Sequence, residues 1–115
     1  MTYGVRVPAD GQAEVVEMGE DLVGKLDVMQ EIIGGYIERI PMLMRGVYSY
    51  WCDEEGHIKE LPKNDFVSYL AGQVIVGTVL ILMRPTADGE VPTMDFETAK
   101  NACKAVNDTI RRMEV

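Results

Sequence analysis

Residues 27–38 read D-V-M-Q-E-I-I-G-G-Y-I-E, and this stretch decides the fold that we expect. Its first half ends an apolar stripe at helical spacing, with Ile32 and Ile33 as the last members, which predicts a helix with one buried face. Gly34 or Gly35 can adopt the left-handed conformation that ends a helix, because glycine has no Cβ. The residues after the glycines alternate between apolar and polar, which is typical of a strand. The stretch therefore predicts a helix, a glycine stop and a strand in direct succession.

The segments on either side repeat these two patterns. Strand patterns occupy residues 3–7, 13–18, 36–41, 46–51 and 74–83. Helical patterns occupy residues 19–33, 66–71 and 96–113. The strand at 74–83 is apolar throughout, so we expect it at the centre of the sheet, covered on both faces, with a bulge or a close approach at Gly77. We expect a single α+β domain over residues 1–115, with a mostly antiparallel sheet of about five strands, two main helices and one short helix, the helices packed on one face.

The composition limits the classes of partner. The chain has 115 residues, of which 47% are hydrophobic, and its net charge is −8. An acidic surface repels phosphate backbones and anionic lipids, so we expect no nucleic-acid partner and no membrane partner. The longest apolar run is about half of the ~20 residues that a membrane helix needs, and no signal-peptide pattern is present, so we expect a cytoplasmic protein. A local cluster of cations can still hold a small phosphorylated ligand.

The two cysteines do not have the spacing of a metal site. Cys103 falls on the apolar stripe of the last helix, so we expect it in the core. Cys52 ends a strand beside charged residues, a position at which it could be partly exposed. We expect no metal, no cofactor and no catalytic residue.

Tyr36 and Glu38 provide the best indication of a ligand site. They alternate on the expected strand and therefore share one face, where the ring can stack on a flat ligand and the carboxylate can accept hydrogen bonds. We expect the glycine corner at Gly35 to aim both side chains into a shared hollow. The alternative is an ordinary solvated strand face. A phosphate loop at the two glycines is disfavoured, because such loops run from strand to helix and this one runs from helix to strand.

The other candidates are polar or aromatic residues near the ends of the expected elements. Tyr50 and Trp51 leave opposite faces of one strand and are suited either to stacking or to the core. The acidic turn at residues 53–56 has too few ligands for calcium, so a solvated turn is favoured there. His57 is the only histidine, has no catalytic partner and is expected at the surface. We name as candidate ligand-binding residues Gly35, Tyr36, Glu38, Arg45, Tyr50, Trp51, Glu54, His57, Lys63, Asn64 and Arg84.

Four motifs occur in order along the chain: M-Q-E-I-I-G-G-Y-I-E, D-E-E-G, L-P-K-N and I-V-G-T-V-L-I. Together they resemble the family catalogued as domain of unknown function 3846, over about residues 28–83. The recurring polar positions of that family fall on Gln30, Gly35, Glu38, Glu54, Gly56 and Asn64. This chain has Asp53 where the family favours asparagine and Met29 where it favours leucine. The resemblance implies a prokaryotic or phage origin and no established activity.

These observations predict a non-enzymatic protein that binds a small nucleotide-like ligand. In a phage, such a protein is expected to act as a sponge that withholds an immune signal in the host cytoplasm, by analogy with other small acidic phage proteins. A pocket shared between subunits would suit so small a domain, so we expect a homo-oligomer. The expected contacts are base stacking by Tyr36, Tyr50 or Trp51, hydrogen bonds from Glu38 and Asn64, and phosphate contacts from Lys63, Arg45 or Arg84.

Two other classes of function remain open. The first is an acidic inhibitor that occupies a basic protein surface as a nucleic-acid mimic does; its binding should weaken steeply with salt. The second is a small hydrolase that uses Glu38 or Glu54 as general base.

Overall fold

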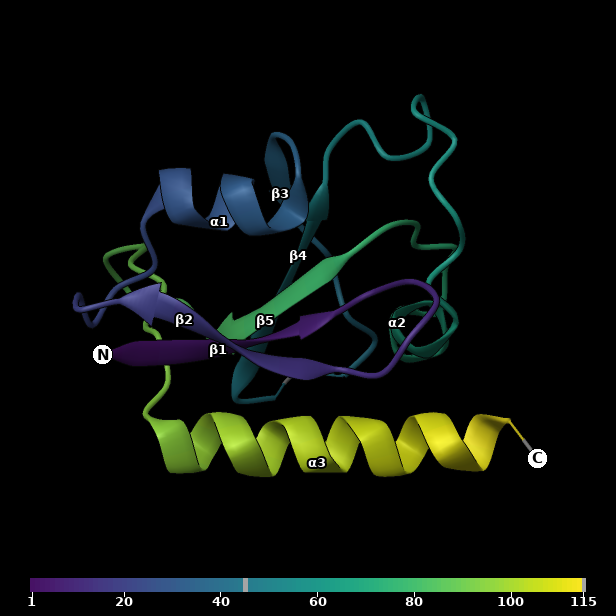
Figure 1. The fold of residues 1–115 in the computed structure, drawn as a ribbon. Helices are drawn as coiled ribbons and strands as arrows, with labels where there is room; N and C mark the ends of the chain where they lie inside the picture. The colour runs from purple at the N-terminus through teal and green to yellow at the C-terminus, as the bar shows by residue number, and fades with distance from the viewer. Residues whose placement is uncertain (45, 115) are drawn as a thin grey trace.

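The computed structural model describes residues 1–44 and 46–114, which form one five-stranded antiparallel sheet with three helices (Figure 1). The strand order across the sheet is β2-β1-β5-β4-β3. The elements in chain order are β1 (Thr2–Val7), β2 (Glu14–Gly19), α1 (Leu26–Ile33), β3 (Ile37–Arg39), β4 (Tyr48–Asp53), α2 (Asp65–Ala71), β5 (Val79–Met83) and α3 (Phe96–Met113). The α+β class, the antiparallel sheet and the central place of β5 are confirmed.

The glycine stop after α1 has the geometry that the sequence predicts. Gly34 has a φ of +92°, and its N–H donates to the carbonyl of Gln30 at 2.8 Å. The helix, however, begins later than expected, at Leu26 instead of about residue 19. The backbone before it is paired across the molecule, because the Gly24 N–H donates to the Val91 carbonyl at 2.7 Å. That pairing holds the segment extended, so it cannot join the helix.

The central strand β5 is shorter than its apolar run. Residues before Val79 turn at Gly77, which has a φ of +80° and donates its N–H to the Pro62 carbonyl at 2.8 Å. A Cβ at Gly77 would lie 2.8 Å from the Leu61 side chain, which confirms the close approach expected there. The residues of the apolar run that precede Val79 therefore form a turn, which contacts the segment before α2.

Helices cover both faces of the sheet, so the expectation of helices on one face is wrong. In Figure 1, α1 lies above the sheet and α3 runs along its other side. On β5, Ile81 belongs to the core under α2 and α3, whereas Leu80 and Leu82 belong to the core under α1. A central strand that is apolar on both faces needs a cover on each. Among the described residues, no helix has both the length and the apolar character that crossing a membrane requires.

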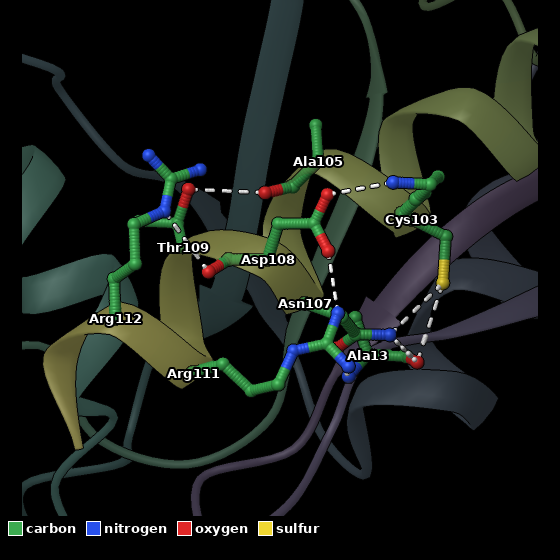
Figure 2. A network of polar contacts seen from close by, with 9 residues as sticks. Ala13, Cys103, Ala105, Asn107, Asp108, Thr109, Arg111 and Arg112 are labelled. Carbon is green, nitrogen blue, oxygen red and sulfur yellow. Dashed lines mark hydrogen bonds and ion pairs between the residues drawn. The ribbon is translucent and has the colours of Figure 1, made fainter. Parts of the chain in front are cut away.

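One side chain of α3 fastens this helix to the start of β2 (Figure 2). The Asn107 side chain accepts a hydrogen bond from the Ala13 N–H at 2.7 Å and donates one to the Ala13 carbonyl at 3.0 Å. The Cys103 thiol also donates to that carbonyl, at 3.2 Å. The amide of Asn107 therefore satisfies both the N–H and the carbonyl of Ala13, as a neighbouring strand would. This contact joins residues far apart in the sequence.

Candidate ligand-binding groove

The structure places Tyr36 and Glu38 at the surface. Tyr36 is 64% exposed, and Glu38 is exposed on the edge strand β3. The Cys52 thiol donates to the Glu38 carboxylate at 3.9 Å. Neither Tyr36 nor Glu38 lines either of the two cavities described below. The site that we describe therefore lies elsewhere, and a ligand role for this pair stays a prediction.

A groove of about 890 Å³ opens where the chain between β3 and β4 leaves the sheet; we call it the β3–β4 groove. Its lining residues include Arg39, Met42, Tyr48, Tyr50, Leu70 and Arg84. The groove thus combines cations, phenols and apolar side chains in one concavity, which is the composition of many small-molecule sites.

The groove exists because the chain detaches from β4 over a short span. The last pairing bond of the β3 side is the Ile40 N–H to the Tyr50 carbonyl, at 2.8 Å. At the other end, the Arg84 N–H donates to the Val47 carbonyl at 2.8 Å. Residues 41–44 and 46, between these two bonds, form no strand pairing with β4, and several of them line the groove. Arg45, one of the predicted phosphate contacts, falls in this span but lies outside the described residues.

Two tyrosines of β4 form one wall of the groove. Tyr48 and Tyr50 alternate on the strand and pack, half-buried, against the core under α2. Burial, and to a lesser degree the neighbouring Tyr48, raises the pKa of Tyr50. The Tyr50 hydroxyl is therefore protonated at neutral pH and can both donate and accept a hydrogen bond.

Two arginines provide the positive charge of the groove. Arg39 lies opposite Trp51 in the β3–β4 pair, and Arg84 directly follows β5. Both are exposed, and neither forms an ion pair with a described residue. No aspartate or glutamate belongs to the described lining. In a chain of net charge −8, this groove is a local region where an anion meets cations and no carboxylate.

The other predicted ligand residues are spread over the surface and the core. Tyr50 and Arg84 line the β3–β4 groove, whereas Lys63 and Asn64 line a second cavity of about 830 Å³ beside α2 and the end of α3. The Trp51 indole N–H donates to the Ser49 hydroxyl at 2.8 Å on the opposite sheet face. Exposed positions in the turn after β4 hold Glu54 and His57. Sequence reasoning missed Arg39, because only the strand register brings it to the groove.

Asn64 has a structural role in place of the ligand contact that we expected. Its side chain, in a residue only 1% exposed, donates to the carbonyls of Val7 at 3.1 Å and Gly77 at 3.0 Å. Its oxygen accepts the N–H of Val67 at 3.2 Å, so Asn64 caps the N-terminus of α2. Both amide hydrogens are used, so none is left to donate to a ligand.

An ion pair between a buried aspartate and an exposed lysine occupies the turn that we expected to be solvated. The Asp53 side chain is 2% exposed and its carboxylate lies 2.7 Å from the Lys59 ammonium. It also accepts the Glu55 N–H at 2.8 Å. Burial acts to raise the pKa of Asp53, but the bonds from Lys59 and Glu55 outweigh it, so this pKa is lower than usual. A Cβ at Gly35 would lie 2.7 Å from both charged atoms, so Gly35 makes room for this pair.

Both cysteines contact the core, but Cys52 lies deeper in it than Cys103, which we expected in the core. Cys52 is 6% exposed in the core, and Cys103 is half-buried at the edge of that core. Burial, with smaller contributions from Glu38 and Asp53, raises the pKa of Cys52 to about 11. The reason is the strand alternation, which turns Cys52 inward beside its charged neighbours.

We expect Cys103 to be the first thiol to react with a disulfide reagent such as Ellman's reagent. The reacting species is the thiolate, and Cys52 is both buried and almost entirely protonated at neutral pH. The native protein should therefore release about one equivalent of reporter quickly, and the second only in denaturant. A Cys103→Ala variant should remove the fast phase. A fast phase that persists in this variant would contradict the placement of Cys52.

A family model matches most of the chain. The model of the family described as Domain of unknown function (DUF3846) matches residues 1–104. No curated protein matches the chain, and no solved structure does. The match covers more than half of the chain and includes every strand, so it confirms the family resemblance that the four motifs indicate.

Proposed function

The chain belongs to the DUF3846 family, and from this premise we propose that it is a non-enzymatic protein that binds a small nucleotide-like anion in the β3–β4 groove. The family description assigns no activity, so the proposal depends on the geometry of the groove. The observation that carries it is a concavity with two exposed arginines, two tyrosines and no described carboxylate, on a chain of net charge −8.

Each part of the groove matches one part of a nucleotide. The planar guanidinium groups of Arg39 and Arg84 suit the oxygens of a phosphate, to which arginine donates two parallel hydrogen bonds. The phenol rings of Tyr48 and Tyr50 offer aromatic surface to a base. Met42 and Leu70 supply apolar surface that excludes water from such a ring.

Binding without turnover is favoured over hydrolysis by the position of the carboxylates. A general base must lie within hydrogen-bond reach of the proton it removes. Glu38 and Glu54, the bases of the hydrolase alternative, are exposed and neither lines the groove. With the prokaryotic or phage origin that the family resemblance implies, the function is sequestration of a nucleotide signal in the cytoplasm, by a homo-oligomer.

The test is a thermal-shift screen of the full chain with nucleotides, followed by recovery of the ligand after denaturation. A ligand at 100 times its dissociation constant adds about 2.7 kcal/mol, which corresponds to a rise in melting temperature on the order of 10 °C for a domain of this size. For a ligand that contacts Arg84, Arg84→Gln should clearly reduce the shift, whereas Arg112→Gln, on the exposed α3 surface, should not change it. The ligand should be recovered unchanged, whereas a converted ligand would favour the hydrolase.

The acidic inhibitor remains a second candidate because of the net charge of −8. It predicts no nucleotide shift at all. It also predicts binding to a basic protein that weakens steeply as the salt concentration rises, since exposed charges are screened. These two results together would replace the proposed function.

A further inference from the structure

We infer that the β3–β4 groove takes a ligand with two anionic groups separated by at least the length of a nucleoside, such as a nucleoside 3′,5′-bisphosphate or a cyclic dinucleotide. This inference rests on the proposed function and concerns the ligand class of the same groove. A nucleoside monophosphate, with its single anionic group, would engage only one of the two arginines.

The first step is the spacing of the two arginines along the sheet. Arg39 lies opposite Trp51, and the N–H of Arg84 bonds to Val47. Trp51 and Val47 are four residues apart on one chain, or about 13 Å at the usual rise of a strand. Strands β3 and β5 lie on either side of β4, so they are about 10 Å apart. The two Cα atoms are therefore roughly 16 Å from each other.

The second step is the direction of their side chains. Arg39 shares a sheet face with its partner Trp51, and Arg84 follows the face of Leu82 by strand alternation; both of these neighbours belong to the core under α1. Side chains on one face of a sheet stand roughly perpendicular to it. The two arginine side chains therefore leave the same sheet face in parallel, from positions that are far apart. A single phosphate would contact both guanidinium groups only if the two side chains bent toward each other.

The third step is the path between the arginines and the tyrosines. Tyr48 and Tyr50 face the opposite side of the sheet, toward α2. Residues 41–44 and 46 form no strand pairing with β4, and the groove beside them is lined by residues from both faces of the sheet. A ring can therefore lie against the tyrosines while its anionic groups remain at the arginines. Glu38, the carboxylate next to Arg39, pairs with Cys52 and so leaves the sheet on the face away from the Arg39 side chain.

The experiment compares AMP, ADP, adenosine 3′,5′-bisphosphate and cyclic di-AMP, with the guanine counterparts of each, by isothermal titration calorimetry on the full chain. We expect the ligands with separated phosphates to bind at least tenfold more tightly than the monophosphates and than ADP or GDP. Arg39→Gln and Arg84→Gln should each weaken the separated class by at least tenfold, because each removes one charge-assisted contact. For a monophosphate, only one of the two substitutions should have an effect.

The outcomes separate this inference from the proposed function. The inference is overturned if both ligand classes bind with equal affinity. It is also overturned if only one of the two arginine substitutions weakens the binding of a ligand with separated phosphates. Either result leaves the proposed function standing. Binding by none of the nucleotides overturns both. Arg112→Gln is the matched control for the loss of one arginine, because it lies on α3 and does not line the groove. Circular dichroism should show the same fold in all three variants, since both groove arginines are exposed.

Discussion

Asn64→Ala is expected to lower the free energy of unfolding by about 3–7 kcal/mol. The loss of a helix N-cap contributes about 1 kcal/mol, and each buried carbonyl left without its donor costs about 1–3 kcal/mol. The two carbonyls are those of Val7 and Gly77, so the substitution releases contacts to β1, to the turn before β5 and to α2 at the same time. A loss of this size is a large part of the roughly 5–15 kcal/mol that stabilises a typical domain.

Urea denaturation measures this effect as a lower midpoint with an unchanged slope. Asn64→Asp should be at least as unstable at neutral pH, because it keeps the oxygen that caps α2 but turns a second oxygen toward two carbonyls. Asn101→Ala, on the exposed side of α3, is the matched control and should change stability by less than about 0.5 kcal/mol. If Asn64→Ala behaves like this control, the buried junction at Asn64 does not exist as described.

The elements that were predicted well are those that local sequence determines. Helix α3 has the bounds that its spacing predicts, because a long periodic stripe follows the Asp95 cap. The glycine stop at Gly34 is equally local. The start of α1 was predicted wrongly, because it depends on pairing with Val91, nearly seventy residues further along the chain. The same holds for the faces of the sheet: the pattern of β5 requires two covers, but nothing in it says which helix supplies each.

The candidate site was predicted in part for a related reason. Tyr50 and Arg84 were named from residue type, and the structure brings them to one groove. Arg39 was not named, because its place depends on the β3–β4 register. Asn64 and Asp53 are polar residues at turns, and in a sequence a buried polar residue with a complete set of partners has the same appearance as a ligand contact. Only the three-dimensional partners distinguish the two.

Gly35→Ala is expected to lower the free energy of unfolding by about 1–3 kcal/mol, the usual cost of inserting a methyl group into a filled site. The new Cβ would lie 2.7 Å from both the Asp53 carboxylate and the Lys59 ammonium, so these groups must shift, and we expect the shift to lengthen their contact. Two other glycines provide controls. Gly46 has no atom within 4 Å of an added Cβ and should tolerate alanine. Gly34 has the same free space but a φ of +92°, so alanine there should cost about 1 kcal/mol from backbone strain alone.

The pH dependence identifies the ion pair as the cause. The pKa of Asp53 is lower in the folded protein than in the unfolded chain, so the pair stabilises the fold above the unfolded value of about 3.9 and this contribution is lost as the pH falls through the folded value. The difference between wild type and Gly35→Ala should therefore be largest near neutral pH and shrink in acid, whereas the Gly34→Ala difference should stay constant. Urea midpoints between pH 7 and pH 3 measure both. A Gly35→Ala deficit that does not change with pH would mean that the methyl group is accommodated without separating Asp53 from Lys59, and the low pKa of Asp53 would then need another source.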